Sequence, residues 1–94
     1  MKIKLTTEFK YKLKRQIDFI ASDKPQAAKN FNKLIFQKIT KIPEMPYKCR
    51  KSIFFENEFI RDLIVKGYII LYRINEAENT IEVFGLHKWE NELS

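Results

Sequence analysis

The stretch of sequence that decides the fold runs from residue 61 to residue 87 and reads RDLIVKGYIILYRINEAENTIEVFGLH. Its centre, Tyr68–Ile74, consists mainly of β-branched and aromatic residues, which are enriched in strands. Lys66 and Gly67 come directly before this centre and are typical of a tight turn. The sequence therefore predicts a strand over residues 68–74 that is entered through a turn.

Further strands are expected on both sides of this one. Thr80–Leu86 alternates in the manner of a strand, and the polar run 75–79 before it is typical of a longer hairpin loop. On the other side, a strand should end within Asp62–Val65. Strands joined by connections this short must run antiparallel, so we expect a meander.

The alternation of side chains assigns the two faces of the central strand. The residues on one face of this strand are bulkier and should pack under the helices: Tyr68, Ile70, Tyr72 and Ile74. Ile69, Leu71 and Arg73 point to the opposite face. Two apolar residues on an open face would form an exposed patch, which tends to be a binding surface.

The N-terminal part predicts a short strand followed by a helix. Lys2–Leu5 alternates polar and apolar residues, and Thr6 or Thr7 can cap the helix that follows. Apolar residues then recur four, four and three positions apart, at Phe9, Leu13, Ile17 and Ile20. This spacing produces one apolar stripe on a helix that ends near residue 21, with the neighbouring lysines and Arg15 interpreted as a solvated face.

A second helix should follow after a short link. Asp23 is a suitable N-cap, Pro25 fits the first helical turn, and Pro43 ends the helix. In the loop that comes next, Met45 and Tyr47 are expected to pack underneath. Two helices with so short a link form a hairpin, so the predicted fold class is α+β, with a short N-terminal strand, a helical hairpin and an antiparallel meander covered by the helices on one face.

Length, charge and cysteine content narrow the class of protein. The 94 residues, 45% of them hydrophobic, suit a single domain over residues 1–94. The formal net charge of +6 favours an anionic partner. The codon bias of an AT-rich genome would, however, also produce a lysine-rich chain with such a charge. With Cys49 as the one cysteine, no internal disulfide can form, and no apolar run reaches the length of a membrane span. We therefore expect a cytoplasmic protein without a membrane partner.

Several kinds of catalytic site are excluded by residue counts. One histidine and one cysteine cannot make a zinc site, and Gly67 and Gly85 alone cannot make a phosphate-binding loop. The remaining candidates are cationic and aromatic residues of the sheet: Arg61, Arg73, His87, Lys88, Trp89, Tyr68 and Tyr72. Such groups could cleave RNA through its 2′-hydroxyl by general acid–base catalysis and charge stabilisation. Each could equally be an ordinary structural residue, and we predict neither a metal nor a cofactor.

In the order and spacing of its motifs, the chain resembles the RelE/ParE superfamily of toxins from type II toxin–antitoxin systems. The resemblance rests on Asp23-x-Pro25-x-Ala27-Ala28, Arg61-Asp62-Leu63, Gly67-Tyr68-x-x-Leu71-Tyr72-Arg73 and a last strand that ends in His87. It covers nearly the whole chain. It implies a growth-inhibiting toxin, of the kind linked to plasmid stabilization, with a cognate antitoxin bound in a heterotetramer or larger complex. Ile69 and Leu71 would contact that antitoxin.

The resemblance leaves the target open. RelE-like members are ribosome-dependent mRNA endonucleases that inhibit translation. We favour this hypothesis narrowly over the inhibition of DNA gyrase. In it, His87, Arg61 and Arg73 are the catalytic candidates, and Lys88, Trp89 and Lys51 contact RNA or another target. An arginine of such members is replaced here by Ile69, which cannot stabilise a phosphorane. ParE-like members instead poison DNA gyrase without catalysis, and a third alternative is an inactive antitoxin-binding module.

Overall fold

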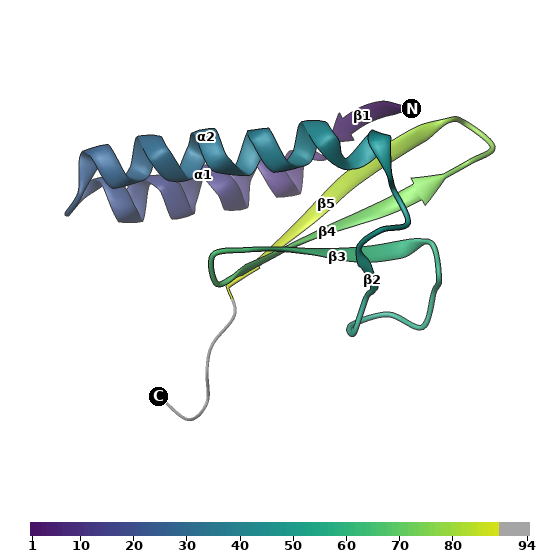
Figure 1. Cartoon of the computed structure of the whole chain (residues 1–94). Helices are drawn as coiled ribbons and strands as arrows, with labels where there is room; N and C mark the ends of the chain where they lie inside the picture. The colour runs from purple at the N-terminus through teal and green to yellow at the C-terminus, as the bar shows by residue number, and fades with distance from the viewer. Residues whose placement is uncertain (89–94) are drawn as a thin grey trace.

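The computed structural model describes residues 1–88 of the chain as two layers, a helical hairpin and a sheet (Figure 1). The first half contains β1 (Lys2–Leu5), α1 (Thr7–Ala21), α2 (Pro25–Lys41) and a 3-10 turn, η1 (Ile42–Glu44). The second half contains β2 (Arg50–Lys51), β3 (Ile60–Val65), β4 (Tyr68–Asn75) and β5 (Thr80–Lys88). The predicted α+β fold, with both helices on one side of the sheet, is confirmed.

The five strands form one sheet in the order β1-β5-β4-β3-β2. Strands β2 to β5 are antiparallel neighbours, as the meander prediction requires. The sequence did not predict two features of this sheet. One is the short strand β2, and the other is the parallel pairing of β1 with β5, in which Ile3 lies opposite Ile81.

Local chemistry explains where the helices and the β3–β4 turn begin. The Thr6 side chain accepts a hydrogen bond of 3.1 Å from the Phe9 N–H and so caps α1. The prediction that Asp23 caps α2 is wrong, because Lys24 holds that position without a side-chain hydrogen bond and Pro25 begins the helix. Lys66 and Gly67 both have positive φ, 44° and 79°, as a two-residue hairpin turn requires.

The main hydrophobic core lies between the helices and the sheet. Phe9, Leu13, Phe31, Ile35 and Ile39 enter it from the helices. Ile70, Tyr72 and Ile74 enter it from β4, and Tyr68 packs at its border, so the predicted inner set of this strand is confirmed. The Tyr72 hydroxyl donates a 2.6 Å hydrogen bond to the Pro46 carbonyl, which joins the core to the loop after α2.

The opposite face of the sheet differs from the prediction. Ile69 and Leu71 are only 1% and 7% exposed, so the expected exposed apolar patch is wrong. The irregular segment 52–59 folds over this face, where the Phe54 ring lies 5.2 Å from the His87 ring. Met45 and Tyr47, expected to pack under the loop, are instead 63% and 41% exposed. The exposed apolar residues therefore lie on the loops, the helices and Ile64 of β3 rather than on β4.

Candidate functional site

His87 lies near the end of β5 on the loop-covered face of the sheet. It is paired with Ile69 in the β4–β5 register, so its side chain points away from the helices. The ring is exposed and meets the Phe54 ring edge-on. General acid–base catalysis by such a ring would also need charged groups placed around the same reacting atom.

Arg61, the second catalytic candidate, serves to hold a loop. Its side chain donates hydrogen bonds to the carbonyls of Glu58 at 2.8 Å, Cys49 at 3.0 Å and Tyr47 at 3.3 Å. Its guanidinium also lies 5.0 Å from the centre of the Tyr47 ring. Arg61 is paired with Tyr72 and therefore lies on the helix side of β3, on the opposite face of the sheet from His87.

Arg73, the third candidate, shares a face with His87 but not a site. Its Nε lies 3.5 Å from Glu82 Oε1 on the neighbouring strand. His87 is opposite Ile69, four residues from Arg73 along β4, which is about 13 Å at the usual rise of a strand. The structure therefore does not bring His87, Arg61 and Arg73 together around one position.

The other predicted target-binding residues are also dispersed. Lys51 lies on β2 opposite Arg61, at the far edge of the sheet from β5. Lys88 is paired with Tyr68 and points toward α1, where its Nζ lies 5.9 Å from the centre of the Phe19 ring. Trp89 lies outside the described residues.

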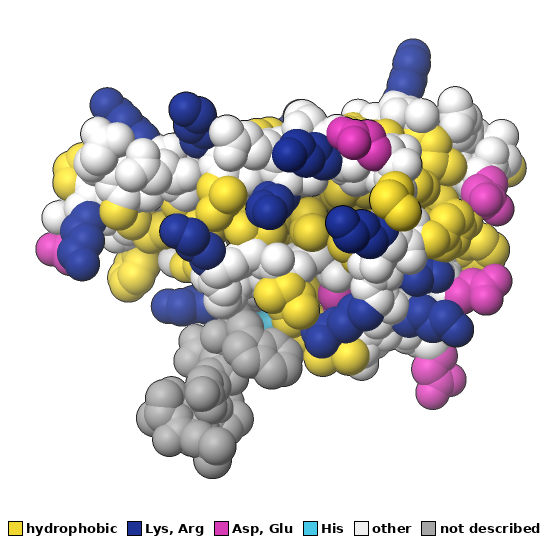
Figure 2. All heavy atoms as spheres, in the orientation of Figure 1, with side chains coloured by type: hydrophobic (Ala, Val, Ile, Leu, Met, Phe, Trp, Pro, Cys, Tyr) yellow, Lys and Arg dark blue, Asp and Glu magenta, His cyan; other side chains and the backbone are white. Residues whose placement is uncertain are grey.

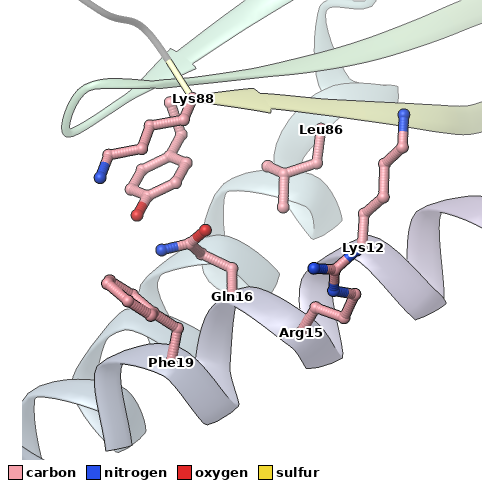
Figure 3. Close-up of a pocket in the computed structure, with 7 residues that line it drawn as sticks. Lys12, Arg15, Gln16, Phe19, Leu86 and Lys88 are labelled. Carbon is pink, nitrogen blue, oxygen red and sulfur yellow. The ribbon is translucent and has the colours of Figure 1, made fainter. Parts of the chain in front are cut away.

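Two hollows flank the last part of β5. The first has a volume of about 370 Å³ and lies between β5 and α1 (Figure 3). Its lining comprises Lys12, Arg15, Gln16, Phe19, Tyr68, Leu86 and Lys88. The second, of about 280 Å³, is lined by Glu8, Lys12, Phe54, Phe55, Leu71, Phe84, Gly85, Leu86 and His87. We call these two hollows together the β5 groove, since they share Lys12 and Leu86.

Sequence reasoning missed most of the β5 groove. It assigned Lys12 and Arg15 to a solvated helix face, and both are exposed, but they also line the wall opposite Leu86. Phe54 and Phe55 had no role in it, although the Phe55 ring lies 5.8 Å from the Phe84 ring. Ile69 and Leu71, the expected antitoxin contacts, are buried, so a partner could reach them only after moving the covering segment.

A buried carboxylate anchors that covering segment. Asp62 is 2% exposed, and its Oδ2 accepts hydrogen bonds from the Ile53 N–H at 3.1 Å and from Arg50 Nε at 3.3 Å. Arg61 and Asp62 are neighbours on β3 with side chains on opposite faces. Arg61 holds the carbonyls that precede β2, and Asp62 holds the Ile53 N–H that follows it. These contacts position the segment that contains Phe54 and Phe55.

Two tyrosines of β4 have raised pKa values. Burial raises the pKa of Tyr72 far above its ordinary value of 10.0, and the neighbouring Cys49 adds to the effect. Burial also raises the pKa of Tyr68. Both phenols therefore stay protonated at neutral pH and can donate a hydrogen bond, but neither can act as a base there.

Two further kinds of site can be assessed across residues 1–88. In that range no group of three or more His, Cys, Asp or Glu side chains is arranged to hold a metal ion. Nor does any helix there have the length and apolar character needed to cross a membrane. On the face drawn in Figure 2, Lys and Arg side chains are spread across the helical layer with apolar side chains between them.

Comparisons with known proteins identify the family. In fold, the chain is similar to a structure described as the chromosomal ParDE TA system from P. aeruginosa, with a TM-score of 0.80 and 17% identity over 96% of this chain and 97% of that one. Residues 3–88 match the family model for the ParE toxin of the type II toxin–antitoxin system parDE. No curated protein sequence matches. The chain therefore belongs to the ParE toxin family, which is the ParE branch of the predicted resemblance.

Proposed function

We propose that this chain is a non-catalytic toxin that inhibits growth by binding DNA gyrase in the cytoplasm, and that a cognate antitoxin neutralises it. ParE-like toxins are understood to act on gyrase in this way, and the match over residues 3–88 supports that branch. The alternative of ribosome-dependent mRNA cleavage requires a set of catalytic groups within reach of one phosphate.

The single observation that carries the proposal is the dispersal of the catalytic candidates. Arg61 donates to three backbone carbonyls on the helix side, and Arg73 pairs with Glu82 about 13 Å along the strand from His87. In addition, Ile69 is buried where RNA-cleaving relatives use an arginine. A binding surface tolerates such an arrangement, whereas acid–base catalysis does not.

One observation still favours the RNase alternative. His87 is exposed at the end of the last strand, where several RNA-cleaving relatives keep a histidine or another basic residue. Alternation along β5, however, points Lys88 to the helix side, so these two neighbours cannot act on the same phosphate from one face.

The test separates the two targets in the same cells. After induction of the toxin, we expect cleaved DNA–gyrase complexes and an SOS response, with a translated mRNA intact by primer extension. Purified toxin should inhibit gyrase supercoiling. His87→Ala should leave that inhibition within about twofold, because a non-catalytic toxin needs no acid–base group and the loss of an exposed side chain leaves the protein folded. Cleaved mRNA together with a harmless His87→Ala variant would establish the RNase alternative, and no growth effect at all would favour an inactive module.

The partner is tested by co-expression with the product of the adjacent reading frame. An antitoxin should restore growth and co-purify with the toxin. Light scattering of the purified complex would then determine whether it is the heterotetramer that the resemblance implies.

A further inference from the structure

The net charge of the chain is concentrated in the helical hairpin. Residues 7–41 contain nine Lys and Arg side chains against three Asp and Glu, which amounts to +6. The rest of the chain contains nine of each sign and is neutral by this count. In Figure 2 the dark-blue Lys and Arg side chains lie along the length of the helical layer. A lysine-rich composition alone would raise the charge of every element, so this distribution singles out the helices.

Within the hairpin, α2 carries no acidic side chain. Its 17 residues include four lysines and neither Asp nor Glu. The side of α2 that faces the core consists of Ala28, Phe31, Ile35 and Ile39. Because a helix has about 3.6 residues per turn, seven exposed residues lie on the opposite side, and we call them the α2 outer face. They are Gln26, Lys29, Asn30, Lys33, Gln37, Thr40 and Lys41.

The lysines of the α2 outer face are not neutralised within residues 1–88. The ion pairs in that range lie on α1 and on the sheet, and none of them includes a residue of α2. The other members of the face carry amide or hydroxyl groups. Lysines together with amides and hydroxyls are the side chains that contact phosphate and sugar in protein–DNA complexes. The chemistry of the face therefore suits a phosphate backbone.

Hollows that contain further cations lie on both flanks of α2. One of them, of about 640 Å³, is lined by Lys33 of α2 and by Lys66 of the β3–β4 turn. The other, of about 250 Å³, lies between the two helices and is lined by Lys10 and Lys14 of α1. Helix α2 is thus a ridge with positive charge on its crest and along both sides, which suits an extended anion better than a single small one.

The length of this ridge matches duplex DNA. From Lys29 to Lys41 the helix axis rises by about 18 Å, and B-DNA presents about ten phosphates over that distance. A protein partner fits less well, because lysine is depleted at protein interfaces and aromatic anchors are enriched there, whereas none of the seven outer residues is apolar. Single strands bind mainly by stacking their bases on aromatic side chains, which the α2 outer face also lacks.

We propose that the α2 outer face binds the phosphate backbone of duplex DNA without sequence preference. This inference goes beyond the proposed function, because an inhibitor of gyrase could act through contacts with the enzyme alone. Binding to DNA would keep the toxin at a raised local concentration beside a DNA-bound enzyme. The contact with DNA is measured without gyrase, so its failure would leave the proposed function to be judged by its own assay.

The first test is a titration of purified toxin into a fluorescently labelled duplex of about 20 base pairs, followed by anisotropy. We expect a Kd of about 10⁻⁵ M near physiological salt, as for other non-specific complexes. Between about 50 and 200 mM salt, the logarithm of the binding constant should fall with a slope of about −3.6, which corresponds to about four phosphate contacts. Absence of binding at the lowest salt, or a slope near zero, would overturn the proposal.

The second test removes two charges from the crest of α2. The double variant Lys29→Gln/Lys33→Gln keeps good helix formers at exposed positions, and circular dichroism would verify that it is folded. We expect DNA binding at least about tenfold weaker at about 100 mM salt, with a salt slope shallower by about 1.8. Unchanged affinity and slope would show that the α2 outer face does not contact the DNA.

The matched control is Lys2→Gln/Lys4→Gln, which removes the same charge from exposed positions of β1. Ile3 and Leu5 pack against the main core, so alternation places these two lysines on the side of the sheet turned away from the helices. We expect the control to weaken DNA binding by less than about threefold, because charges that far from the duplex are screened. Equal weakening by both variants would reduce the effect to net charge and refute the assignment to α2.

Other classes of ligand are separated with the same proteins. A single-stranded RNA of about 20 nucleotides should bind more weakly than the duplex, because the α2 outer face lacks stacking groups. Tighter binding of the RNA would assign the face to RNA and overturn the proposal. The cognate antitoxin should bind the Lys29→Gln/Lys33→Gln variant within about threefold of the parent affinity, since lysines contribute little to most protein interfaces. If antitoxin affinity falls while DNA binding is unchanged, the face belongs to the antitoxin and the proposal is wrong.

Discussion

The two faces of the sheet are both buried, but different structures bury them. On one face, α1 and α2 cover Ile70, Tyr72 and Ile74 with regular helical packing. On the other, the irregular segment 52–59 covers Ile69 and Leu71 and leaves Phe54 and Phe55 themselves about 45% exposed. The first cover packs mainly through hydrophobic contacts, whereas hydrogen bonds to Asp62 of β3 anchor the second. This difference predicts which substitutions unfold the protein and which only release the loop.

The largest effect should come from the helix-covered face. Ile70→Ala removes a side chain that is 0% exposed, and we expect it to lower the free energy of unfolding by about 4 kcal/mol. Ile69→Ala, on a residue 1% exposed, should cost only about 2 kcal/mol, because the covering loop can move into the space. Urea denaturation of both variants measures the comparison. Equal losses would show that the loop is as rigid a cover as the helices.

A somewhat smaller effect is expected where the loop is anchored. Asp62→Ala deprives Arg50 and the Ile53 N–H of their shared acceptor. We expect a cost of about 3 kcal/mol from the loss of two hydrogen bonds to a buried carboxylate, although Arg50 itself is 40% exposed and can be solvated. Limited proteolysis should then cut within residues 52–59. Asp18→Ala is the control, because its pair with Lys14 is exposed and should contribute well under 1 kcal/mol. Unchanged proteolysis in Asp62→Ala would contradict the anchoring role.

Close contact on the loop-covered face provides a third prediction. A Cβ on Gly85 would lie 3.1 Å from Leu71 Cδ1 and 3.3 Å from Leu71 Cβ. Gly85→Val should therefore destabilise the protein by about 2 kcal/mol through overpacking. Adding Leu71→Ala should recover part of that loss, so the two changes will not be additive. Strict additivity in thermal or urea unfolding would mean that Leu71 is not the obstacle.

The smallest effect at neutral pH concerns the link between the core and the loop after α2. Tyr72→Phe removes the hydroxyl that donates to the Pro46 carbonyl and should cost about 1 kcal/mol. Burial raises the pKa of Tyr72 above 10.0, so above pH 10 the unfolded chain loses this proton while the folded protein keeps it. Stability should then fall by up to about 1.4 kcal/mol per pH unit, and less steeply in the Phe variant. Parallel pH profiles for the two proteins would contradict this account.

The helix-covered face could be predicted from the sequence because its determinants are local. Alternation along Tyr68–Ile74 placed the inner residues correctly, and the spacing of Phe9 and Leu13 did the same for α1. The cover of the other face depends on contacts between residues far apart, such as Phe54 with His87 and Asp62 with Arg50, which no local period encodes. Burial of Ile69 and Leu71 therefore could not be predicted in this way.

Part of the candidate site could have been inferred but was not. His87 and Lys88 are neighbours on one strand, so alternation already places their side chains on opposite faces, yet the RNA-cleavage hypothesis uses His87 as a catalytic group and Lys88 as an RNA contact. The bulge at Phe84, which has no partner on β4, has a weak signal in Gly85, since a glycine within a strand often accompanies a bulge. The parallel pairing of β1 with β5 could not be predicted from local patterns, because it depends on the whole topology.

That pairing of β1 with β5 also determines the order in which the protein can fold. Lys2–Leu5 is synthesised well before its partner, Thr80–Val83, which follows more than 70 residues later. The helical hairpin can form during synthesis, whereas the sheet cannot be completed until β5 has emerged. A nascent chain therefore carries an unpaired β1 and an uncovered helical face throughout translation. Folding of the finished sheet is therefore a late event.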